Sequence, residues 1–404
     1  MVNVREKKVI IVGGGPVGAI AALILAQAGV PVAVVEKAAG VVFDYRASTF
    51  HPPTLDLLEG CGATAALLAM GLEAPVNQIR DRQAGLIAEF DFSELRNDTR
   101  HPYRLQCEQF KLVGWAYGEL AAFSHVEMLM EHEFVSLRAD ADGVTVSASG
   151  PGGVVRELRG DFVIGADGGR SAVRKALGIA FDGFTYPENF LVSGTRFDFA
   201  AAMPGICKVN YTADPTEWYL LLQIPDMWRV IMPVDPDVEP DDAMKDESIQ
   251  KALQNLLRRD EDYDIVVKGI YRVSQRVAER YRSGRAFLAG DAAHINNPLG
   301  GVGLNGGLHD AISLTAKLLD VYNGAPESVL DAYETQRKPE AITAINAMTQ
   351  RNKQLLEERD PVIRRKNLDE VAGIARDPAR AYAYMLKASM IESVRRCGLV
   401  EAVA

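Results

Sequence analysis

The feature that most constrains the fold of this chain is a glycine-rich turn close to its start, in the run Val9-Ile-Ile-Val-Gly-Gly-Gly-Pro-Val-Gly18. Four apolar residues lead into the turn, a helix-forming stretch of small apolar residues follows it, and a second apolar run at residues 32–35 ends at Glu36. A strand, a glycine turn, a helix and a second strand closed by an acid are the signature of a dinucleotide-binding Rossmann unit. The pattern therefore predicts a parallel α/β sheet that binds a dinucleotide.

Each glycine of this turn has a predicted task. Gly13 allows the tight turn, Gly15 lets a pyrophosphate approach the backbone, and Gly18 lets the helix pack on the strand. The unpaired N–H groups at the helix start then face the anion, and Glu36 accepts from a ribose hydroxyl. The alternative, a glycine turn without a ligand, is disfavoured because strand, helix, second strand and acid are all in place. The candidate contacts in this unit are Gly13, Gly15, Pro16, Val17, Gly18, Glu36 and Lys37.

The composition excludes several classes of protein. The 404 residues correspond to roughly two to three domains of about 150 residues. A net charge of −10, with 44 Lys and Arg spread along the chain, argues against a nucleic-acid partner. The N-terminus lacks the apolar core of a signal peptide, and no run approaches the roughly 20 apolar residues of a membrane span.

The four cysteines, Cys61, Cys107, Cys207 and Cys397, form no C-x-x-C pair. This spacing argues against a zinc site, a dithiol redox centre and a disulfide framework, and it favours a cytoplasmic location. Four histidines, His51, His101, His125 and His132, show no metal-ligand spacing with cysteines or carboxylates, so no metal is expected.

Up to about residue 165 the pattern predicts the nucleotide-binding unit, interrupted by one antiparallel ribbon. A helix is predicted at residues 16–27, with proline at its start and glycine after its end, and another begins at residues 54–59. Apolar runs at 126–130, 134–137, 144–149 and 154–159, joined by glycine turns, predict strands of an antiparallel ribbon. A buried strand at 162–165 then returns to the main sheet.

The pattern changes between residues 191 and 273, where aromatic-rich alternating strands are separated by proline and acidic turns. These strands, including 218–223 and 228–233, predict a second, mostly β domain inserted into the first. A buried strand within 284–291 resumes the first domain, and the tail beyond Thr335 predicts long helices.

Two further motifs join the first. One is Gly165-Ala-Asp-Gly-Gly-Arg-Ser-Ala-Val-Arg174, and the other is Gly290-Asp-Ala-Ala-His294 followed by Pro298-Leu-Gly-Gly-Val-Gly-Leu-Asn305. With these three motifs in this order, the chain resembles the class A flavoprotein aromatic hydroxylases, the single-component FAD monooxygenases of the para-hydroxybenzoate hydroxylase type. The resemblance covers roughly residues 7–345 and is weakest in the inserted sheet.

The resemblance implies roles for residues outside the first turn. Asp167 would lie near the flavin pyrophosphate and the nicotinamide path, Asp291 would contact the ribityl chain, and Gln109 would lie near the flavin diphosphate. Arg46 matches an arginine that contacts the cofactor, although Arg46 and Gln109 could also be surface residues. The segment 298–305, which we call the flavin loop, matches the loop that contacts the flavin in the family. Its candidate contacts are Pro298, Gly300, Gly301, Gly303, Leu304 and Asn305.

This flavin loop departs from the family at two positions and has a second possible interpretation. Val302 stands where many relatives carry Gln, and Gly306 stands where Ser or Thr is common. The segment 301–306 also spells G-x-G-x-x-G, but it lacks a preceding strand and a following strand that ends in an acid, so a second dinucleotide fold is rejected. The backbone N–H groups of the loop open into a helix, where they would stabilise the anion of a reduced flavin.

Other polar and aromatic residues also have expected roles. His294 and His309 lie near the flavin loop, where a structural hydrogen-bonding role is favoured over proton transfer. The acidic cluster at 235–246 is expected to be a solvated turn. Four aromatic residues of the inserted domain, Tyr211, Trp218, Tyr219 and Trp228, are candidates for an aromatic pocket, although alternation along the strands would assign half of them to the core or the solvent face.

The predicted fold is α/β, a Rossmann-type FAD-binding domain with an inserted mostly β substrate domain and C-terminal helices. The predicted boundaries are 1–75, 101–180 and 281–345 for the FAD-binding domain, 76–100 and 181–280 for the substrate domain, and 346–404 for the C-terminal helical segment. That segment would cap the cleft or form a subunit interface, which leaves a homodimer open.

The predicted activity is the hydroxylation of a small phenolic or heteroaromatic acid with NADH or NADPH and O2, through a flavin hydroperoxide. No catalytic side chain is singled out, because the flavin carries the chemistry and the sequence does not identify a base that deprotonates the substrate. An FAD-dependent dehydrogenase or halogenase is the alternative, although the halogenase pattern Trp-x-Trp-x-Ile-Pro is absent. A non-enzymatic flavin-binding protein is a third.

Overall fold

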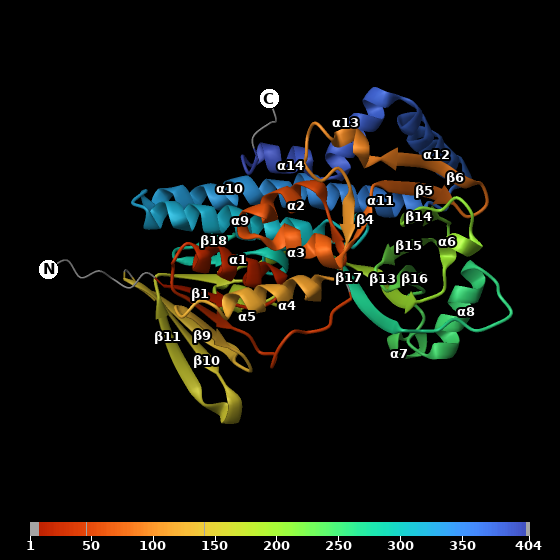
Figure 1. The fold of residues 1–404 in the computed structure, drawn as a ribbon. Helices are drawn as coiled ribbons and strands as arrows, with labels where there is room; N and C mark the ends of the chain where they lie inside the picture. The colour runs from red at the N-terminus through yellow and green to blue at the C-terminus, as the bar shows by residue number, and fades with distance from the viewer. Residues whose placement is uncertain (1–7, 46, 141, 401–404) are drawn as a thin grey trace.

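The first glycine motif follows β1 (Val9–Val12), the strand at the centre of a six-stranded sheet (Figure 1). The computed structural model describes residues 8–45, 47–140 and 142–400. β1 pairs in parallel with β2 (Val32–Val35) on one side and with β12 (Phe162–Gly165) on the other. Every residue of these three strands is buried, as expected for apolar strands of a parallel sheet with both faces covered.

The sheet continues on both sides of this centre. β19 (Ala286–Leu288) extends it in parallel next to β12, and β18 (Arg282–Ser283) is an antiparallel edge. At the other edge β8 (Val126–Leu129) pairs in parallel with β2. The assignment of residues 126–130 to the antiparallel ribbon is therefore wrong, because an apolar run specifies a strand but not its partner. The predicted α/β fold class is confirmed.

Three helices pack around the glycine turn. α1 (Pro16–Gln27) has the predicted bounds and is followed by Gly29 at φ +77°. It packs against α9 (Gly303–Tyr322) and α4 (Gln109–Leu120). Because α1 is apolar almost all round, both neighbours and the sheet are needed to bury it.

Two small sheets are attached to this core. The ribbon of β9 (Glu133–Asp140), β10 (Gly143–Ser149) and β11 (Val155–Gly160) is antiparallel, as predicted, and extends away from the main sheet in Figure 1. The second small sheet contains β3 (Thr49–Phe50) and β4 (Leu72–Ala74), each paired with β7 (Arg104–Gln106), and it was not predicted.

The inserted domain is built on an eight-stranded sheet in which only one neighbouring pair, β14 with β5, is parallel. Its two long strands, β13 and β17, reach from this sheet toward the nucleotide-binding core (Figure 1). In sheet order the strands are β20 (His294–Ile295), β17 (Val267–Ala278), β13 (Phe181–Thr195), β16 (Met227–Val234), β15 (Tyr219–Ile224), β14 (Val209–Ala213), β5 (Val76–Asp81) and β6 (Gly85–Asp91). The domain boundaries stay a prediction.

Alternation divides the four candidate aromatic residues between the two faces of this sheet. Tyr211 and Trp218 belong to an apolar cluster that includes Leu299 of the flavin loop. Tyr219 and Trp228 belong to a different cluster, which α8 (Asp246–Leu256) covers. This division is the one expected from alternation, because neighbouring strand positions point to opposite faces, and contact of any of these rings with substrate stays a prediction.

The acidic stretch at 235–246 is also not simply a solvated turn. It contains α7 (Pro240–Ala243) and the first residue of α8. Asp241 and Asp242 lie in the first turn of α7, where the positive end of the helix dipole favours carboxylates.

The C-terminal part is helical, as predicted. α10 is followed by a π-helical turn at Ala341–Asn346, and α12 packs on β6 of the eight-stranded sheet. None of the helices in the described part of the chain combines the length and apolar character that a membrane crossing requires. The helices of this part are α10 (Asp331–Glu340), α11 (Ala347–Glu357), α12 (Pro361–Arg376), α13 (Pro378–Ala388) and α14 (Ile391–Arg396), and short helices elsewhere are α2 (Pro52–Leu58), α3 (Ala63–Met70), α5 (Ala172–Ala176) and α6 (Phe199–Ala202).

Candidate functional site

The predicted motifs meet at one edge of the parallel sheet. Gly13 follows β1, Glu36 follows β2, Asp167 lies two residues after β12, and Gly290 lies two residues after β19. These four strands are parallel, so their carboxyl ends lie on the same edge. Ligands of open α/β sheets bind at this edge, and segments far apart in sequence form it together.

The glycine turn has the geometry that a dinucleotide requires. Gly13 has φ +102°, and a Cβ at this position would lie 2.4 Å from Ala166 O. A Cβ on Gly18 would lie 1.9 Å from Gly13 O, so the helix approaches the turn too closely for any side chain. At Gly15, in contrast, a Cβ would meet no heavy atom within 4 Å. The turn is thus closed on the protein side and open at Gly15, which fits an approaching pyrophosphate.

The start of α1 also offers free donors. The first hydrogen bond within the helix runs from Ala19 N to Gly15 O, at 2.8 Å. The amides of Val17 and Gly18 precede that bond, so they lie among the unpaired N–H groups of a helix N-terminus. Such a terminus favours an anion.

The Glu36 carboxylate is held at the end of β2 by two backbone amides. Gly14 N donates to Glu36 Oε2 at 2.6 Å, and Ala38 N donates to Glu36 Oε1 at 2.8 Å. On the other side of Gly14, Tyr117 of α4 donates its hydroxyl to Gly14 O at 2.8 Å, and burial raises the pKa of Tyr117, with the charge of Glu36 adding to the shift. The acid is thus fixed beside the glycine turn, while the Lys37 side chain is exposed.

Val17 connects the first motif to the third. A Cβ on Gly290 would lie 2.8 Å from Val17 Cγ2, and a Cβ on Gly307 of α9 would lie 2.7 Å from the same atom. Gly290 also has φ +62°, a conformation that favours glycine. Asp291, which follows it, is exposed at the sheet edge.

The flavin loop is tied to the segment that follows Arg46, although Arg46 itself lies outside the described residues. Asn305 is the main connection. Its Oδ1 accepts from His51 N at 2.8 Å, and its Nδ2 donates to Thr49 O at 2.8 Å and to Gly301 O at 2.6 Å. Asn305 therefore supports the loop through side-chain bonds, in addition to its place near the start of α9.

His51 holds the same loop and was missed as a functional residue. Its Nε2 donates to Gly300 O at 2.9 Å, across 249 residues of sequence. Burial, together with the positive charge of Arg104, lowers the pKa of His51 to about 3, so the ring is neutral at physiological pH. No local spacing could have found this contact, because its partner is a backbone carbonyl of a distant loop.

The helix start after the flavin loop resembles that of α1. The first hydrogen bond within α9 runs from Gly306 N to Val302 O at 2.8 Å, so the amides of Gly303 and Leu304 are not used by the helix. Pro298 accepts from Gly301 N at 3.0 Å, which closes the turn before them.

Asp167 and Gln109 have structural contacts of their own. The Asp167 carboxylate accepts from Ser171 Oγ at 2.5 Å and from Ala172 N at 2.6 Å, so it caps the start of α5. Gln109 is the first residue of α4, and its backbone N donates to Ala47 O at 3.1 Å. The contact of both residues with a cofactor stays a prediction.

A fully buried ionic network lies behind the flavin loop. Arg337 Nε donates to Asp310 Oδ1 at 2.7 Å, and His294 Nε2 contacts Asp310 Oδ2 at 2.8 Å. Burial alone would raise the pKa of Asp310, but His294 and Arg337 lower it to about 2. His309 is also buried and contacts Thr54 Oγ1 at 2.8 Å. These contacts agree with the structural role predicted for both histidines.

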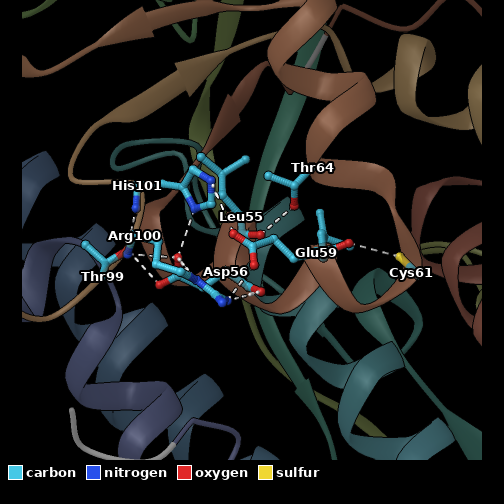
Figure 2. A network of polar contacts seen from close by, with 9 residues as sticks. Leu55, Asp56, Glu59, Cys61, Thr64, Thr99, Arg100 and His101 are labelled. Atoms are coloured by element: carbon cyan, nitrogen blue, oxygen red, sulfur yellow. Dashed lines mark hydrogen bonds and ion pairs between the residues drawn. The ribbon is translucent and has the colours of Figure 1, made fainter. Parts of the chain in front are cut away.

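A second polar cluster joins α2 and the turn that follows it to the loop before β7. His101 Nδ1 lies 2.9 Å from Asp56 Oδ1, and its Nε2 lies 3.5 Å from Glu59 Oε1 (Figure 2). Ligand atoms of these three residues lie within 4.8 Å of one another, a proximity that the sequence spacing did not indicate, and the expectation that no metal binds stays a prediction. The same carboxylates already accept from Thr99 and Arg100, which ties that loop to α2.

Polar side chains also lie between the flavin loop and the eight-stranded sheet. Arg229 of β16 is buried and donates to Ser48 Oγ, next to Thr49. Burial lowers the pKa of Arg229, and the neighbouring Tyr271, Asp44 and Glu108 oppose that shift.

Comparisons with known proteins agree with this arrangement. The family described as "FAD binding domain" matches residues 6–348. Para-nitrophenol 4-monooxygenase of Pseudomonas sp. (strain WBC-3) is 33% identical over 88% of this chain and 89% of its own length. The 6-hydroxy-3-succinoylpyridine 3-monooxygenase HspB of Pseudomonas putida is 35% identical over 84% of this chain and 86% of its own.

Solved structures give the same result. The crystal structure of p-nitrophenol 4-monooxygenase PnpA from Pseudomonas putida DLL-E4 superposes with a TM-score of 0.90 at 32% identity, covering 95% of this chain and 98% of that one. A ternary complex of aklavinone-11 hydroxylase with FAD and aklavinone has a TM-score of 0.77 at 28% identity, covering 88% and 70%.

Proposed function

We propose the function of this chain from one premise: it belongs to the FAD binding domain family of flavoprotein aromatic hydroxylases. It is an FAD-dependent monooxygenase of aromatic compounds that uses NAD(P)H and O2. The chemistry that bound FAD supplies is the acceptance of hydride and the transfer of one oxygen atom from O2.

The proposed substrate is a single-ring phenol or hydroxypyridine that carries a second polar substituent. The names of the two relatives, a nitrophenol and a hydroxypyridine monooxygenase, both describe such rings, and both match this chain along most of their length. The observation that carries the proposal is the TM-score of 0.90 over 98% of the nitrophenol enzyme, a coverage that extends to the inserted domain, where we propose that the substrate binds.

The residues proposed to hold FAD lie around the sheet edge and the flavin loop. The open face of Gly15 and the amides of Val17 and Gly18 would receive the pyrophosphate, and Glu36 would accept from the adenosine ribose. Asp291 and the amides of Gly303 and Leu304 would face the flavin half. The complete proposed set is Gly13, Gly15, Pro16, Val17, Gly18, Glu36, Lys37, Arg46, Gln109, Asp167, Asp291, Pro298, Gly300, Gly301, Gly303, Leu304 and Asn305.

The proposed substrate pocket lies between the flavin loop and the face of the eight-stranded sheet that carries Tyr211 and Trp218. These rings pack in one apolar cluster with Leu299, which supports a dry site for an aromatic ring. Buried Arg229 supplies a positive charge near Ser48, so it would stabilise a phenolate or an anionic substituent. This electrostatic role needs no side-chain base, and none is assigned.

The test is oxygen incorporation by the purified FAD-loaded protein. We expect 4-nitrophenol, a hydroxypyridine or a 4-substituted phenol to stimulate NAD(P)H oxidation and to yield a product that carries ¹⁸O from ¹⁸O2. NAD(P)H oxidation with H2O2 as the sole oxygen product for every ring would overturn the proposal in favour of a flavoenzyme that does not insert oxygen. Labelling of a polycyclic substrate alone would overturn the single-ring substrate.

Location and subunit state are further parts of the proposal. We place the protein in the cytoplasm, which the four free cysteines support because a reducing compartment keeps thiols unpaired. We also propose a homodimer through the C-terminal helices, supported by the exposed apolar side chains of Val362 and Ile363 on α12. Light scattering of the purified protein tests this, and a monomer at micromolar concentration would contradict it.

A further inference from the structure

α11 of the C-terminal helical segment lies directly on the flavin loop. Asn352 Nδ2 donates to Leu299 O at 3.0 Å. A Cβ on Gly300 would lie 3.2 Å from Asn352 Nδ2 and 3.7 Å from Met348 Sδ. The match to the family ends at residue 348, so Asn352 belongs to a part of the chain that the family motifs do not describe.

Two consecutive carbonyl groups of the loop accept hydrogen bonds from side chains that lie on opposite sides of the loop in the sequence. Leu299 O is bound by Asn352 of α11, and the next carbonyl, Gly300 O, is bound by His51 ahead of α2. On a third side Asn297 accepts from Leu299 N at 3.1 Å and donates to Tyr186 Oη at 3.4 Å. Three side chains, Asn297, Asn352 and His51, therefore hold three consecutive peptide groups, from Pro298–Leu299 to Gly300–Gly301.

α11 is itself anchored to the inserted domain. Lys353, the residue after Asn352, is buried and forms ion pairs with Glu188 of β13 and with Glu357. Its Nζ also lies 4.9 Å from the centre of the Tyr186 ring. About two turns earlier, at the residue just before α11, Gln275 of β17 donates to Asn346 O at 2.9 Å. The helix that binds the loop is thus fixed to both long strands of the eight-stranded sheet.

Holding a carbonyl also orients the next amide. A trans peptide is planar, with its C=O and N–H pointing in opposite directions. With Leu299 O bound by α11, the N–H of Gly300 points to the side of the loop away from that helix. Gly300 and Gly301 have φ +131° and +66°, so the backbone here has few steric restraints of its own and depends on such contacts.

We propose that Asn352 is a positioning residue of the flavin loop, which sets the orientation of the Leu299–Gly300 peptide and thereby the electrostatics that the loop presents to FAD. The inference rests on the proposed function. It gives the C-terminal segment a part in the reaction, because α11 contacts both the inserted domain and the flavin loop and so fixes the loop relative to that domain.

The test compares Asn352→Leu with Gln354→Leu, a matched control two positions along α11 where the side chain is exposed. We expect Asn352→Leu to weaken FAD binding to the apoprotein roughly 3- to 10-fold, the effect of one lost hydrogen bond. The midpoint potential of the bound flavin should become more negative, and amide hydrogen exchange at residues 299–301 should rise. Gln354→Leu should match the wild type in all three measurements.

Asn352→Asp provides a second variant of nearly the same shape if Asn352→Leu does not fold. Its carboxylate faces the Leu299 carbonyl without a proton to donate, so it should also lower the potential and the FAD affinity. Wild-type potential and FAD affinity in a folded Asn352 variant would overturn the inference, even if thermal stability fell. Failure of the wild type itself to bind FAD or to oxygenate any ring would instead overturn the proposed function.

Discussion

Val17 of the glycine turn packs against Gly290, which lies 273 residues further along the chain, so closely that a Cβ on Gly290 would lie 2.8 Å from Val17 Cγ2. The same methyl group leaves no room for a side chain at Gly307 of α9, where a Cβ would lie 2.7 Å from it. Three segments thus meet around one valine side chain. Small residues at these positions are what allow the first and third motifs to form one site.

Gly307→Ala should therefore be destabilising. Its added Cβ would lie 2.7 Å from Val17 Cγ2 and 3.1 Å from Gly290 Cα, so we expect a loss of about 1–3 kcal/mol in the free energy of unfolding. Adding Val17→Ala should recover part of the loss. The control is Gly118→Ala in α4, where a Cβ meets no atom within 4 Å and should stabilise by up to about 1 kcal/mol. Urea unfolding measures all three, and equal stabilities of Gly307→Ala and wild type would contradict the packing argument.

Glu36→Gln should weaken FAD binding more than it weakens the fold. The amide side chain keeps one acceptor for Gly14 N or Ala38 N but loses the charge, and charge-assisted hydrogen bonds contribute about 1.5–3 kcal/mol. We expect the dissociation constant for FAD to rise by roughly 10- to 100-fold. Fluorescence titration of the apoprotein with FAD checks this, with Glu133→Gln, which neutralises an exposed carboxylate on β9 of the ribbon, as the control. An unchanged dissociation constant for Glu36→Gln would remove Glu36 from the proposed FAD site.

The pH dependence of the free energy of unfolding should reflect the lowered pKa of His51. Its pKa is about 3 in the folded protein and about 6.5 when unfolded, so the unfolded chain binds the extra proton between these values. Its contribution is therefore complete above pH 6.5 and is lost as pH falls toward 3, by up to about 1.4 kcal/mol per pH unit. Urea unfolding between pH 7.5 and 5 should show a steeper loss for wild type than for His51→Gln. Parallel curves would mean that His51 is not held neutral.

Asp310→Asn should cost more stability than most single substitutions. The change leaves Arg337 buried without its carboxylate partner, and breaking a buried pair in this way costs about 3–5 kcal/mol. A surface control is Asp369→Asn, whose pair with Arg365 is exposed and should contribute less than about 1 kcal/mol. Thermal unfolding of the two variants should differ by many degrees. Similar melting temperatures would show that the network tolerates the lost charge.

Arg229→Met should act on the substrate rather than on FAD. It preserves much of the buried volume and removes the charge beside Ser48, so KM for an anionic phenol should rise at least roughly 10-fold, the effect of about 1.4 kcal/mol. The FAD dissociation constant should stay near the wild-type value. Steady-state kinetics and FAD titration test the two halves separately. Equal changes in both would place Arg229 in the FAD site instead.

The local sequence was enough to predict a helix or strand wherever its formation depends on residues nearby in the chain. The helix at Pro16–Gln27 and the strands at 32–35 and 162–165 have the predicted bounds, since proline, glycine and continuous apolar runs act within a few residues. The partner of β8 was not predictable in this way, because pairing in a sheet joins segments that the pattern treats separately. The same limit concealed the meeting of His101 with Asp56 and Glu59.

The sequence by itself determined the Rossmann unit, its cofactor class and the family, because glycines and an acid at fixed spacing act through the local backbone. Only the tertiary structure decided which residues hold the flavin loop. Asn352 and His51 reach Leu299 and Gly300 by binding backbone carbonyls, which every residue carries. A contact with a main-chain atom leaves no residue type to recognise at the other end, so folding in three dimensions alone specifies it.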